Sequence, residues 1–551
     1  MTRHATDELV LLPLGGAGEI GMNFNAYGFG PEDGRKWIVV DCGVLFGREG
    51  NTPGIDLILP DISWLAERRD DVLAIVATHA HEDHIGAIHL LWPMLRCPVY
   101  ATPFTARMIE GKLEEAGLRE RLKINIVPLH GRLKLGPFDV EFVSITHSIP
   151  EPNALAIRTP LGTVVHTGDW KLDPEPLIGE STDANAFRRL GDEGVLALVC
   201  DSTNALVEGE SGSEAKVREA LSTLIGTLKG RVAVTAFASN VARLDSVAKV
   251  AKAHGREVAL VGRAMHKIVA AARDTGYLAD FPNVLDEEEA AELPPHRVLY
   301  LCTGSQGEWR AALSRIAAGD HPNVKLGPGD AVVFSSRIIP GNELAIFELH
   351  NKLAGLGVEV LSAEDHFVHA SGHPARGELA QMYRWTRPQI AVPVHGELRH
   401  MHAHARLAES LQVPQAVNVE NGHLLRLAPG RAQVIDETPS GRIHLDGQVL
   451  VAEGAGLARA RRSLAFAGMI AITLVLDSKD RVAADPTIIL EGIPEPVHEA
   501  VRSAVEGALR RYNSKRDDEE KLRETVRRIA RGAAEDAWGK KPVTRVEVVR
   551  L

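Results

Sequence analysis

Three histidines and an aspartate in the order HxHxDH occupy residues 79–84 of the chain. The apolar run 72–77 before them predicts a strand that ends just ahead of the cluster. His79 and His81 are two residues apart, so on extended backbone they point the same way and can chelate one ion. Asp83 and His84 follow on a predicted turn and can face a second ion. One divalent ion needs about three or four such ligands and two ions need more, so this segment predicts part of a metal centre.

Further ligand-type residues follow other short apolar runs of the chain. The ends of predicted strands of a sheet bring side chains from distant sequence to one edge, so these residues are candidates to complete the centre. Each of them alone is better explained as a turn residue. Together with residues 79–84 they favour a binuclear site; they are Asp41, His147, Asp169, Asp201 and His395.

A glycine pattern near the start is a competing signal. Residues 16–21 read GxGxxG, and Asp41 lies 20 residues past the last glycine, as in dinucleotide-binding folds. That fingerprint requires a helix directly after the glycines, whereas residues 22–31 carry alternating aromatics, two glycines and a proline. A strand and a turn are predicted there, and no nucleotide cofactor is expected.

The composition fits an intracellular enzyme of several domains. The chain has 551 residues, 45% of them hydrophobic, so two to four domains with full cores are expected. The first residues lack an apolar signal segment, and the longest apolar stretch, around 464–476, is too short to cross a bilayer. Four scattered cysteines favour a reduced, cytoplasmic protein without a membrane partner. The net charge of -11 does not by itself favour nucleic acid, but it is a global sum.

The positions of the candidate ligands predict the domain organisation. All but His395 lie before residue 202, and strands and helices alternate through the intervening segment, which predicts an inserted parallel α/β domain. We expect a metal-binding domain at 1–205 and 367–440, the insert at 206–366, a linker at 441–460 and a C-terminal α/β domain at 461–551. The last 51 residues hold 14 Lys and Arg against 9 Asp and Glu; mixed-charge solvated helices explain this better than RNA contact.

Several motifs resemble those of a known family. The HxHxDH segment with later His, Asp and His residues resembles the metallo-β-lactamase superfamily. Asp201, His373 and His395 are similar to three motifs of its β-CASP nucleic-acid branch, in which a final histidine goes with RNA-processing members. The segments 15–23, 237–240, 302–308 and 339–343 resemble bacterial ribonuclease J.

The resemblance implies an α/β fold and a substrate. The fold is a metallo-β-lactamase αββα sandwich with an inserted β-CASP α/β domain and a small C-terminal α/β domain. It also implies single-stranded RNA as the substrate, and a homodimer or tetramer assembled through the C-terminal domain.

The residues can then be given roles. His79, His81 and His147 are expected to hold one ion and Asp83, His84 and His395 the other, with Asp169 bridging. A hydroxide between two cations would attack phosphorus in line. These ligands suit Zn²⁺ best, and Mn²⁺ or Mg²⁺ also. The catalytic residues are expected to be Asp83, Asp169 and His373.

Outer residues are assigned in the same way. Asp41 and Asp201 are expected to orient ligands. A pocket for a 5′-phosphate is predicted, to which the chain would contribute Ser239, Asn240, Ser371, Gly372 and His373. For Ser239 and Asn240 a helix N-cap is an equal alternative. The histidines at 400, 402 and 404 are expected to lie on a helix and to bind no metal.

The function that follows is metal-dependent hydrolysis of RNA phosphodiesters. A 5′→3′ exonuclease that prefers 5′-monophosphate ends, with additional endonuclease activity, is expected to serve RNA maturation, rRNA processing included, and decay. The alternatives are a small-molecule metallohydrolase, a DNA nuclease of the same superfamily and a non-catalytic scaffold. The large insert argues against the first alternative, His395 against the second and the full ligand set against the third.

Overall fold

The computed structural model describes residues 6–47, 50–513 and 518–551. Its contacts divide the chain into two compact units, the first formed by 1–45 and 59–441 and the second by 46–58 and 442–551. Among the described residues, no helix combines the length and the apolar character that a membrane span requires.

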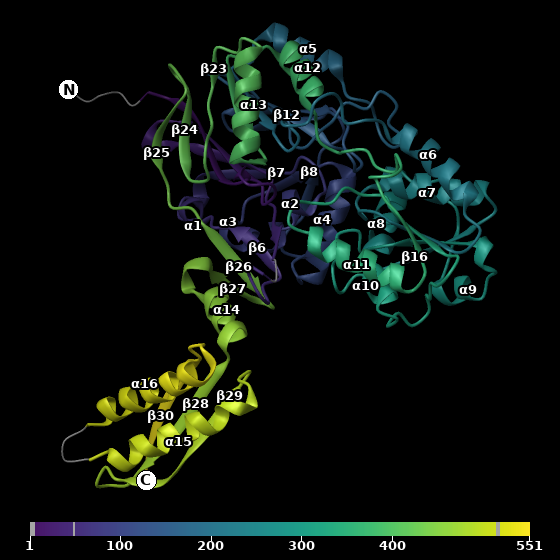
Figure 1. Ribbon diagram of the computed structural model, residues 1–551. Coiled ribbons are helices and arrows are strands. Elements are labelled where there is room, and N and C mark those ends of the chain that lie inside the picture. Colours follow the sequence, from purple (N-terminus) through teal and green to yellow (C-terminus); the bar gives the residue numbers. More distant parts are fainter. Residues whose placement is uncertain (1–5, 48–49, 514–517) are drawn as a thin grey trace, which may run out of the picture. The chain divides into compact units, whose positions relative to one another are not determined.

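Two sheets packed face to face form the core of the first unit (Figure 1). The strands of one sheet are, in spatial order, β25 (Gln433–Glu437), β24 (His423–Ala428), β1 (Glu8–Gly15), β3 (Phe24–Gly30), β4 (Lys36–Val40), β7 (Val72–Val76), β8 (Val99–Ala101) and β9 (Ile124–Ile126). Those of the other are β10 (Arg132–Leu135), β11 (Phe138–Ser144), β12 (Asn153–Thr159), β13 (Gly162–His166), β14 (Ala197–Asp201), β21 (Ile390–Val394) and β23 (Gln415–Ala416). Alternate residues of both sheets, such as Ile38 and Val40 with Val140 and Phe142, interdigitate in one buried cluster.

Helices cover the outer faces of this sandwich. On the second sheet, α5 (Ala184–Glu193), α12 (Arg376–Thr386) and α13 (Leu398–Ser410) bury their apolar stripes in a common cluster. On the first sheet, α3 (Ile88–Leu95) packs on α4 (Pro103–Glu115), which lies against β8 and β9. The predicted αββα sandwich is therefore confirmed.

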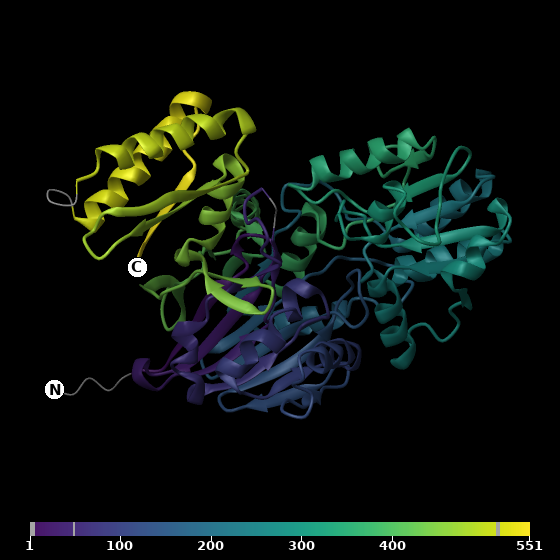
Figure 2. The ribbon, with the colours of Figure 1, turned by 90° about the horizontal axis from the view of Figure 1, so that it is seen from below.

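The predicted parallel α/β insert is also present. Its sheet has the order β17 (Val284–Leu285), β16 (Glu257–Val261), β18 (Val298–Cys302), β15 (Val232–Thr235), β19 (Ala331–Phe334) and β20 (Glu359–Leu361), with all paired strands parallel. The main helices are α6 (Glu214–Thr227), α7 (Val241–Ala253), α8 (Arg263–Asp274), α10 (Ala312–Ala317) and α11 (Glu343–Gly355), and Figure 2 shows helices on both sides of the sheet.

A buried ion pair inside the insert lies where the chain enters and leaves it. Arg243 of α7 is fully buried and donates to both carboxylate oxygens of Glu214, at 2.9 and 3.0 Å, where the chain enters the insert. The same guanidinium donates at 3.0 Å to the carbonyl of Val368, where the chain leaves it, and to Ser335. The Arg243 side chain thus contacts both segments of the chain, the one that enters the insert and the one that leaves it.

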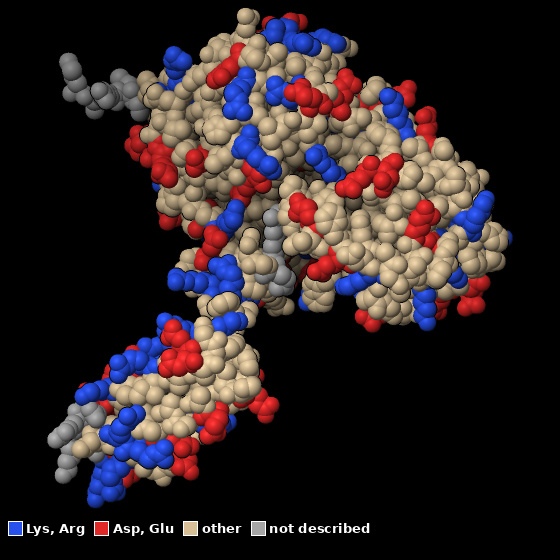
Figure 3. Space-filling view, in the orientation of Figure 1, with Lys and Arg blue, Asp and Glu red and all other residues tan. Residues whose placement is uncertain are grey.

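The second unit contains a small α/β domain. Strands β29 (Val482–Glu491), β28 (Met469–Leu476) and β30 (Val543–Arg550) form one sheet, and α15 (Glu495–Arg511) and α16 (Glu519–Trp538) cover one face of it. Basic and acidic side chains alternate over this unit (Figure 3), and Arg523 and Arg527 each pair with a glutamate of their own helix. The excess of Lys and Arg over Asp and Glu in the last 51 residues is thus spread over solvated helices.

The predicted linker at 441–460 is folded, so this prediction is corrected. Strands β26 (Arg442–Asp446) and β27 (Val449–Ala452) form a hairpin within a sheet of order β27-β26-β6-β5, where β6 spans Leu57–Pro60 and β5 Leu45–Phe46. Helix α14 (Leu457–Ala467) follows, and its Arg461 donates to the Gly54 carbonyl at 3.0 Å.

The buried ion pair of the insert gives a first prediction. The substitution Arg243→Met leaves Glu214 buried without its cation, so the free energy of unfolding should fall by about 3–5 kcal/mol. Urea unfolding followed by circular dichroism measures this change. The control Arg527→Met removes only an exposed pair with Glu524 and should keep the midpoint of the wild type. Equal midpoints for Arg243→Met and the wild type would contradict the role of the pair.

Candidate metal centre

The candidate ligands converge from four strand ends of the two sheets. His79 and His81 follow β7, and Asp83 and His84 lie on the short helix α2 (Glu82–Ile85) directly after them. From the second sheet, His147 follows β11, Asp169 follows β13, and His395 follows β21. The backbone of His395 has φ 49°, a left-handed conformation that a histidine seldom adopts. Such local strain is tolerated where the surroundings hold a side chain in a required direction.

Three imidazoles and a carboxylate form a first group. The Nε2 atom of His79 lies 3.2 Å from Nδ1 of His81, which lies 3.0 Å from Nε2 of His147. The carboxylate of Asp169 is 4.0 Å from both His79 and His147. All four ligand atoms lie within 4.8 Å of one another, a spacing that suits four-coordinate binding of one ion.

A second group shares the same carboxylate. Oδ2 of Asp169 lies 3.1 Å from Nε2 of His84, and Oδ2 of Asp83 lies 3.2 Å from Nε2 of His395. Oδ1 of Asp169 is buried and accepts no hydrogen bond, although Nδ1 of His395 is 3.1 Å away. A buried carboxylate oxygen without a hydrogen-bond donor suits a bound cation, so the residues present fit two metal ions.

Burial and neighbouring charge set the protonation of these ligands. Burial and the neighbouring imidazoles hold the pKa of His79 and His147 well below the usual range, and burial lowers that of His81 to about 4. Burial also acts to lower the pKa of His395, but Asp169, Asp201 and Asp83 outweigh it and raise this pKa to about 10. The lowered pKa values of the first group favour the neutral imidazoles that bind metal, and in the second group a cation would compete with a proton on His395.

Buried acceptors orient the ligand imidazoles. Nδ1 of His84 donates to Asp41 at 2.7 Å, and Asp41 also accepts from Thr78, which contacts Nδ1 of His79. His147 donates from Nδ1 to the carbonyl of Gly372. These contacts leave Nε2 of all three histidines facing the centre.

Two predicted residues, His373 and Asp201, lie at the edge of the centre. Nδ1 of His373 lies 2.8 Å from Oδ2 of Asp201 and 3.8 Å from Oδ2 of Asp169. Burial acts to lower the pKa of His373, but Asp201 and Asp169 raise it overall. Its side chain is 24% exposed, so this imidazole faces the space beside the ligands.

The predicted phosphate pocket is brought together only in part. Ser371, Gly372 and His373 form one loop beside His147. Ser239 is half-buried after β15, in the insert. Asn240 is the N-cap of α7: its Oδ1 accepts from the Arg243 amide at 2.9 Å and its Nδ2 faces Glu214. Both polar atoms of the Asn240 side chain are thereby used inside the protein. The N-cap alternative therefore applies to Asn240, which is no longer a candidate for the phosphate pocket.

The local structure of two other patterns is as predicted. The glycine segment 16–21 leads through β2 (Ala17–Gly18) to β3 rather than to a helix, and the Gly16 carbonyl accepts from the His395 amide. The histidines at 400, 402 and 404 lie on α13; His404 contacts Ser202 and Tyr383, each at 2.9 Å. None of the three belongs to a metal-type group among the described residues.

Asn23 lies against the centre but was missed in the sequence. Its Nδ2 atom is 3.0 Å from Nε2 of His84, and its amide donates to the Asp83 carbonyl. The asparagine ends the glycine-rich segment 15–23, so its place in that motif was the available signal.

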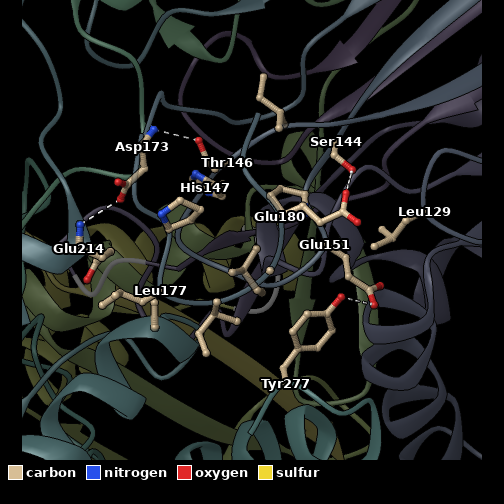
Figure 4. Close-up of a pocket in the computed structure, with 17 residues that line it drawn as sticks. Leu129, Ser144, Thr146, His147, Glu151, Asp173, Leu177, Glu180, Glu214 and Tyr277 are labelled. Atoms are coloured by element: carbon tan, nitrogen blue, oxygen red, sulfur yellow. Dashed lines mark hydrogen bonds between the residues drawn. The ribbon is translucent and has the colours of Figure 1, made fainter. Parts of the chain in front are cut away.

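A cavity behind His147 is acidic and does not suit RNA. Figure 4 shows its lining, which includes Glu151, Asp173, Glu180 and Glu214. Each carboxylate is occupied: Glu151 accepts from Tyr277 at 2.9 Å, Glu180 from Ser144 at 3.0 Å, and Asp173 from the amide of Glu214. Four carboxylates would repel a phosphate chain, so the cavity is not a candidate RNA site.

Four family descriptions match successive parts of the chain. Residues 25–196 match the metallo-beta-lactamase superfamily, and 229–353 match the beta-CASP domain of ribonuclease J. Residues 358–419 match the "Zn-dependent metallo-hydrolase RNA specificity domain", and 457–551 match the C-terminal domain of ribonuclease J.

Similar proteins extend over nearly the whole chain. Ribonuclease J of Sinorhizobium meliloti is 50% identical over 99% of this chain and 98% of its own length. Ribonuclease J of Thermus thermophilus is 39% identical over 85% of this chain and 82% of its own length. A crystal structure of a protein of unknown function from Enterococcus faecalis V583 has a TM-score of 0.52 and 16% identity, covers 76% of this chain and 100% of its own, and shows the fold alone.

The contact between His147 and Gly372 gives a second prediction. A Cβ atom at residue 372 would lie 2.7 Å from Cε1 of His147, so Gly372→Ala should displace this imidazole. We expect metal affinity to fall by about 10- to 100-fold, as when the support of a ligand is lost. Titration of the metal-free protein with Zn²⁺ measures this.

The matched control is Gly441→Ala, because a Cβ atom there has no neighbour within 4 Å. It should bind metal like the wild type. Unchanged affinity in Gly372→Ala would show that the loop does not position His147.

Proposed function

Because the chain belongs to the ribonuclease J family and is a metal-dependent ribonuclease, we propose that it degrades single-stranded RNA with two divalent ions. The observation that carries the proposal is the buried carboxylate of Asp169, which belongs to both the first and the second ligand group. We propose a 5′→3′ exonuclease that prefers 5′-monophosphate ends and also cuts internally, in RNA maturation, including that of rRNA, and decay. Zn²⁺ suits the ligands best, and Mn²⁺ or Mg²⁺ also.

The chain's own groups support hydrolysis of a phosphodiester. Two bound divalent ions would supply Lewis-acid stabilisation of the developing charge and an activated water. Asp83 is more open to the outside than its neighbours in the second group, with 29% of its side chain exposed against 2–3% for His84 and His395, and in this proposal it accepts the proton of that water. His373 bonds Asp201 through Nδ1, which leaves Nε2 to donate to the leaving oxygen.

The selectivity for a 5′ end is proposed from the loop beside the centre. The Ser371 hydroxyl and the backbone around Gly372 offer donors to one terminal phosphate next to the metal groups. Ser239, which follows β15 in the insert, is proposed as a further donor to this phosphate. A pocket at that place would fix the distance from the end to the cut and so release mononucleotides one after another.

Assembly and location complete the proposal. We infer a homodimer, or a tetramer of two dimers, that forms through the C-terminal domain, in the cytoplasm, where four free, buried cysteines would stay reduced. The test of assembly is light scattering on a chain ended at Gly456, which keeps the β26–β27 hairpin. A shift to monomer is expected, and an unchanged oligomer would refute the assignment.

The metal requirement gives a third prediction. Elemental analysis should find about two divalent ions per chain, and chelation should abolish RNA cleavage because the ligands alone cannot activate water. The substitution His81→Ala should remove activity and keep the circular dichroism spectrum, since the sheets have their own apolar core. A matched DNA strand should resist cleavage. Full activity after complete metal removal, or equal cleavage of DNA, would count against the proposal.

The pocket gives a fourth prediction. One charge-assisted phosphate contact contributes roughly 1.5–3 kcal/mol, so 5′-monophosphate RNA should be degraded about 10- to 100-fold faster than 5′-hydroxyl RNA. A 5′-triphosphate should be disfavoured, and Ser371→Ala should reduce the preference. Rates on one RNA carrying each end measure this. Identical rates for monophosphate and triphosphate ends would remove the pocket but not the metal chemistry.

A further inference from the structure

Asn204 lies between the loop 371–373 and the insert, and both polar atoms of its side chain make hydrogen bonds. It is 5% exposed and follows β14. Its Nδ2 atom donates to Oγ of Ser371 at 2.7 Å and to the carbonyl of His373 at 3.1 Å. Its Oδ1 atom accepts from Nη1 of Arg337 at 3.1 Å.

Arg337 fixes which way the Asn204 amide points. A guanidinium has only donors, so the atom of Asn204 that faces it must be the carbonyl oxygen. The NH₂ group is then turned toward Ser371 and His373. Without the guanidinium, the amide loses the donor that holds its oxygen, and only the acceptor carbonyl of His373 keeps Nδ2 turned toward the loop.

This orientation determines how the Ser371 hydroxyl can bond. Oγ of Ser371 accepts from Asn204 and, at 3.2 Å, from the amide of His373. A hydroxyl oxygen has two acceptor positions and one hydrogen, so both acceptor positions are taken by the protein. The remaining capacity is the O–H hydrogen, which can only donate. An anionic oxygen accepts such a bond, and two donors on the serine oxygen strengthen it.

Arg337 links this arrangement to the insert. It follows β19, and its backbone carbonyl accepts from Nε2 of Gln306 at 2.9 Å, from the loop after β18. After β15, the chain forms β16 and β18 on one side of it and then β19 on the other. The strand order therefore reverses between β15 and β19, which makes this place a topological switch point. Ligands of open α/β sheets bind at the carboxyl ends of such strands, where Ser239 and Arg337 both lie.

We propose that Asn204, oriented by Arg337, is a positioning residue that makes the Ser371 hydroxyl a dedicated donor to the 5′-terminal phosphate. The inference rests on the proposed 5′-end pocket and names the residues that give it its selectivity. Asn204 acts through Ser371, and Arg337 acts through Asn204.

The test is the ratio of exonuclease rates on 5′-monophosphate and 5′-hydroxyl RNA of one sequence, measured on the full chain loaded with metal. Asn204→Asp has almost the same shape but places carboxylate oxygens against Ser371, whose hydroxyl then donates to them. We expect the ratio to fall from about 10- to 100-fold to about 3-fold or less, mainly through a higher KM for the monophosphate RNA. The control Asn418→Asp adds the same charge beside His402, away from the loop, and should keep the ratio.

Substitutions of the exposed Arg337 give a second arm that is independent of folding at Asn204. Arg337→Lys keeps a donor toward Asn204 and should keep the ratio, whereas Arg337→Met should lower it by at least about 3-fold. In a Ser371→Ala background, Arg337→Met should cause no further fall. General damage would lower both rates together and leave the ratio unchanged.

The outcomes separate this inference from the proposed function. A wild-type protein that degrades both RNAs equally would overturn the proposed 5′-end selectivity and this inference with it. If the wild-type preference survives in Asn204→Asp, only the role of Asn204 is overturned. Should Asn204→Asp not fold, a preference that survives in Arg337→Met has the same meaning. If Arg337→Met still lowers the ratio in the Ser371→Ala background, the phosphate contact belongs to Arg337 itself. That result would refute the proposed action of Arg337 through Asn204 and Ser371.

Discussion

The buried carboxylate of Asp169 is the group on which the arrangement of the site depends. Its Oδ2 atom faces three imidazoles, with His84 at 3.1 Å and His79 and His147 at 4.0 Å, and its Oδ1 atom faces His395 at 3.1 Å. An ionised carboxylate inside a protein is costly unless cations or donors surround it. Surrounding histidines hold the pKa of Asp169 at about 2 even against its burial. The two groups therefore assemble around a charge that the sandwich could not otherwise bury.

The insert takes part in the site through a few buried polar contacts. Arg243 holds the chain where it enters and leaves the insert, next to the loop that carries Ser371 and His373. On the other side of this loop, His147 donates to Gly372. The loop is thus held on one side by the insert and on the other by His147, a candidate metal ligand. This explains how a domain without any candidate ligand of its own can affect what happens at the ligands.

Much of this arrangement could be predicted from the sequence, because it depends on residue type and strand ends. The HxHxDH segment and the later His and Asp residues each follow an apolar run, so their meeting at one edge follows from sheet geometry. Asn204 could not be found in this way, since an asparagine after a strand is common in turns and its partners are 133 to 169 residues away. Asn240 could be read as a pocket residue or as a cap, and only the position of the Arg243 amide decides. The hairpin at 442–452 escaped because its strands are short and partly exposed, so its alternation resembles that of a loop.

The hydrogen bond from His147 to the Gly372 carbonyl has a thermodynamic consequence. A ligand that orders this loop and an ion that orders this imidazole each bind better when the other is present, because each removes part of the conformational freedom that the other must restrict. Linkage requires that the two effects be equal in free energy. An RNA end bound in the loop, as proposed, would therefore tighten the hold on the ion by the same factor by which the ion would tighten the hold on the end. Under metal scarcity, chains engaged with substrate would keep their ions longest.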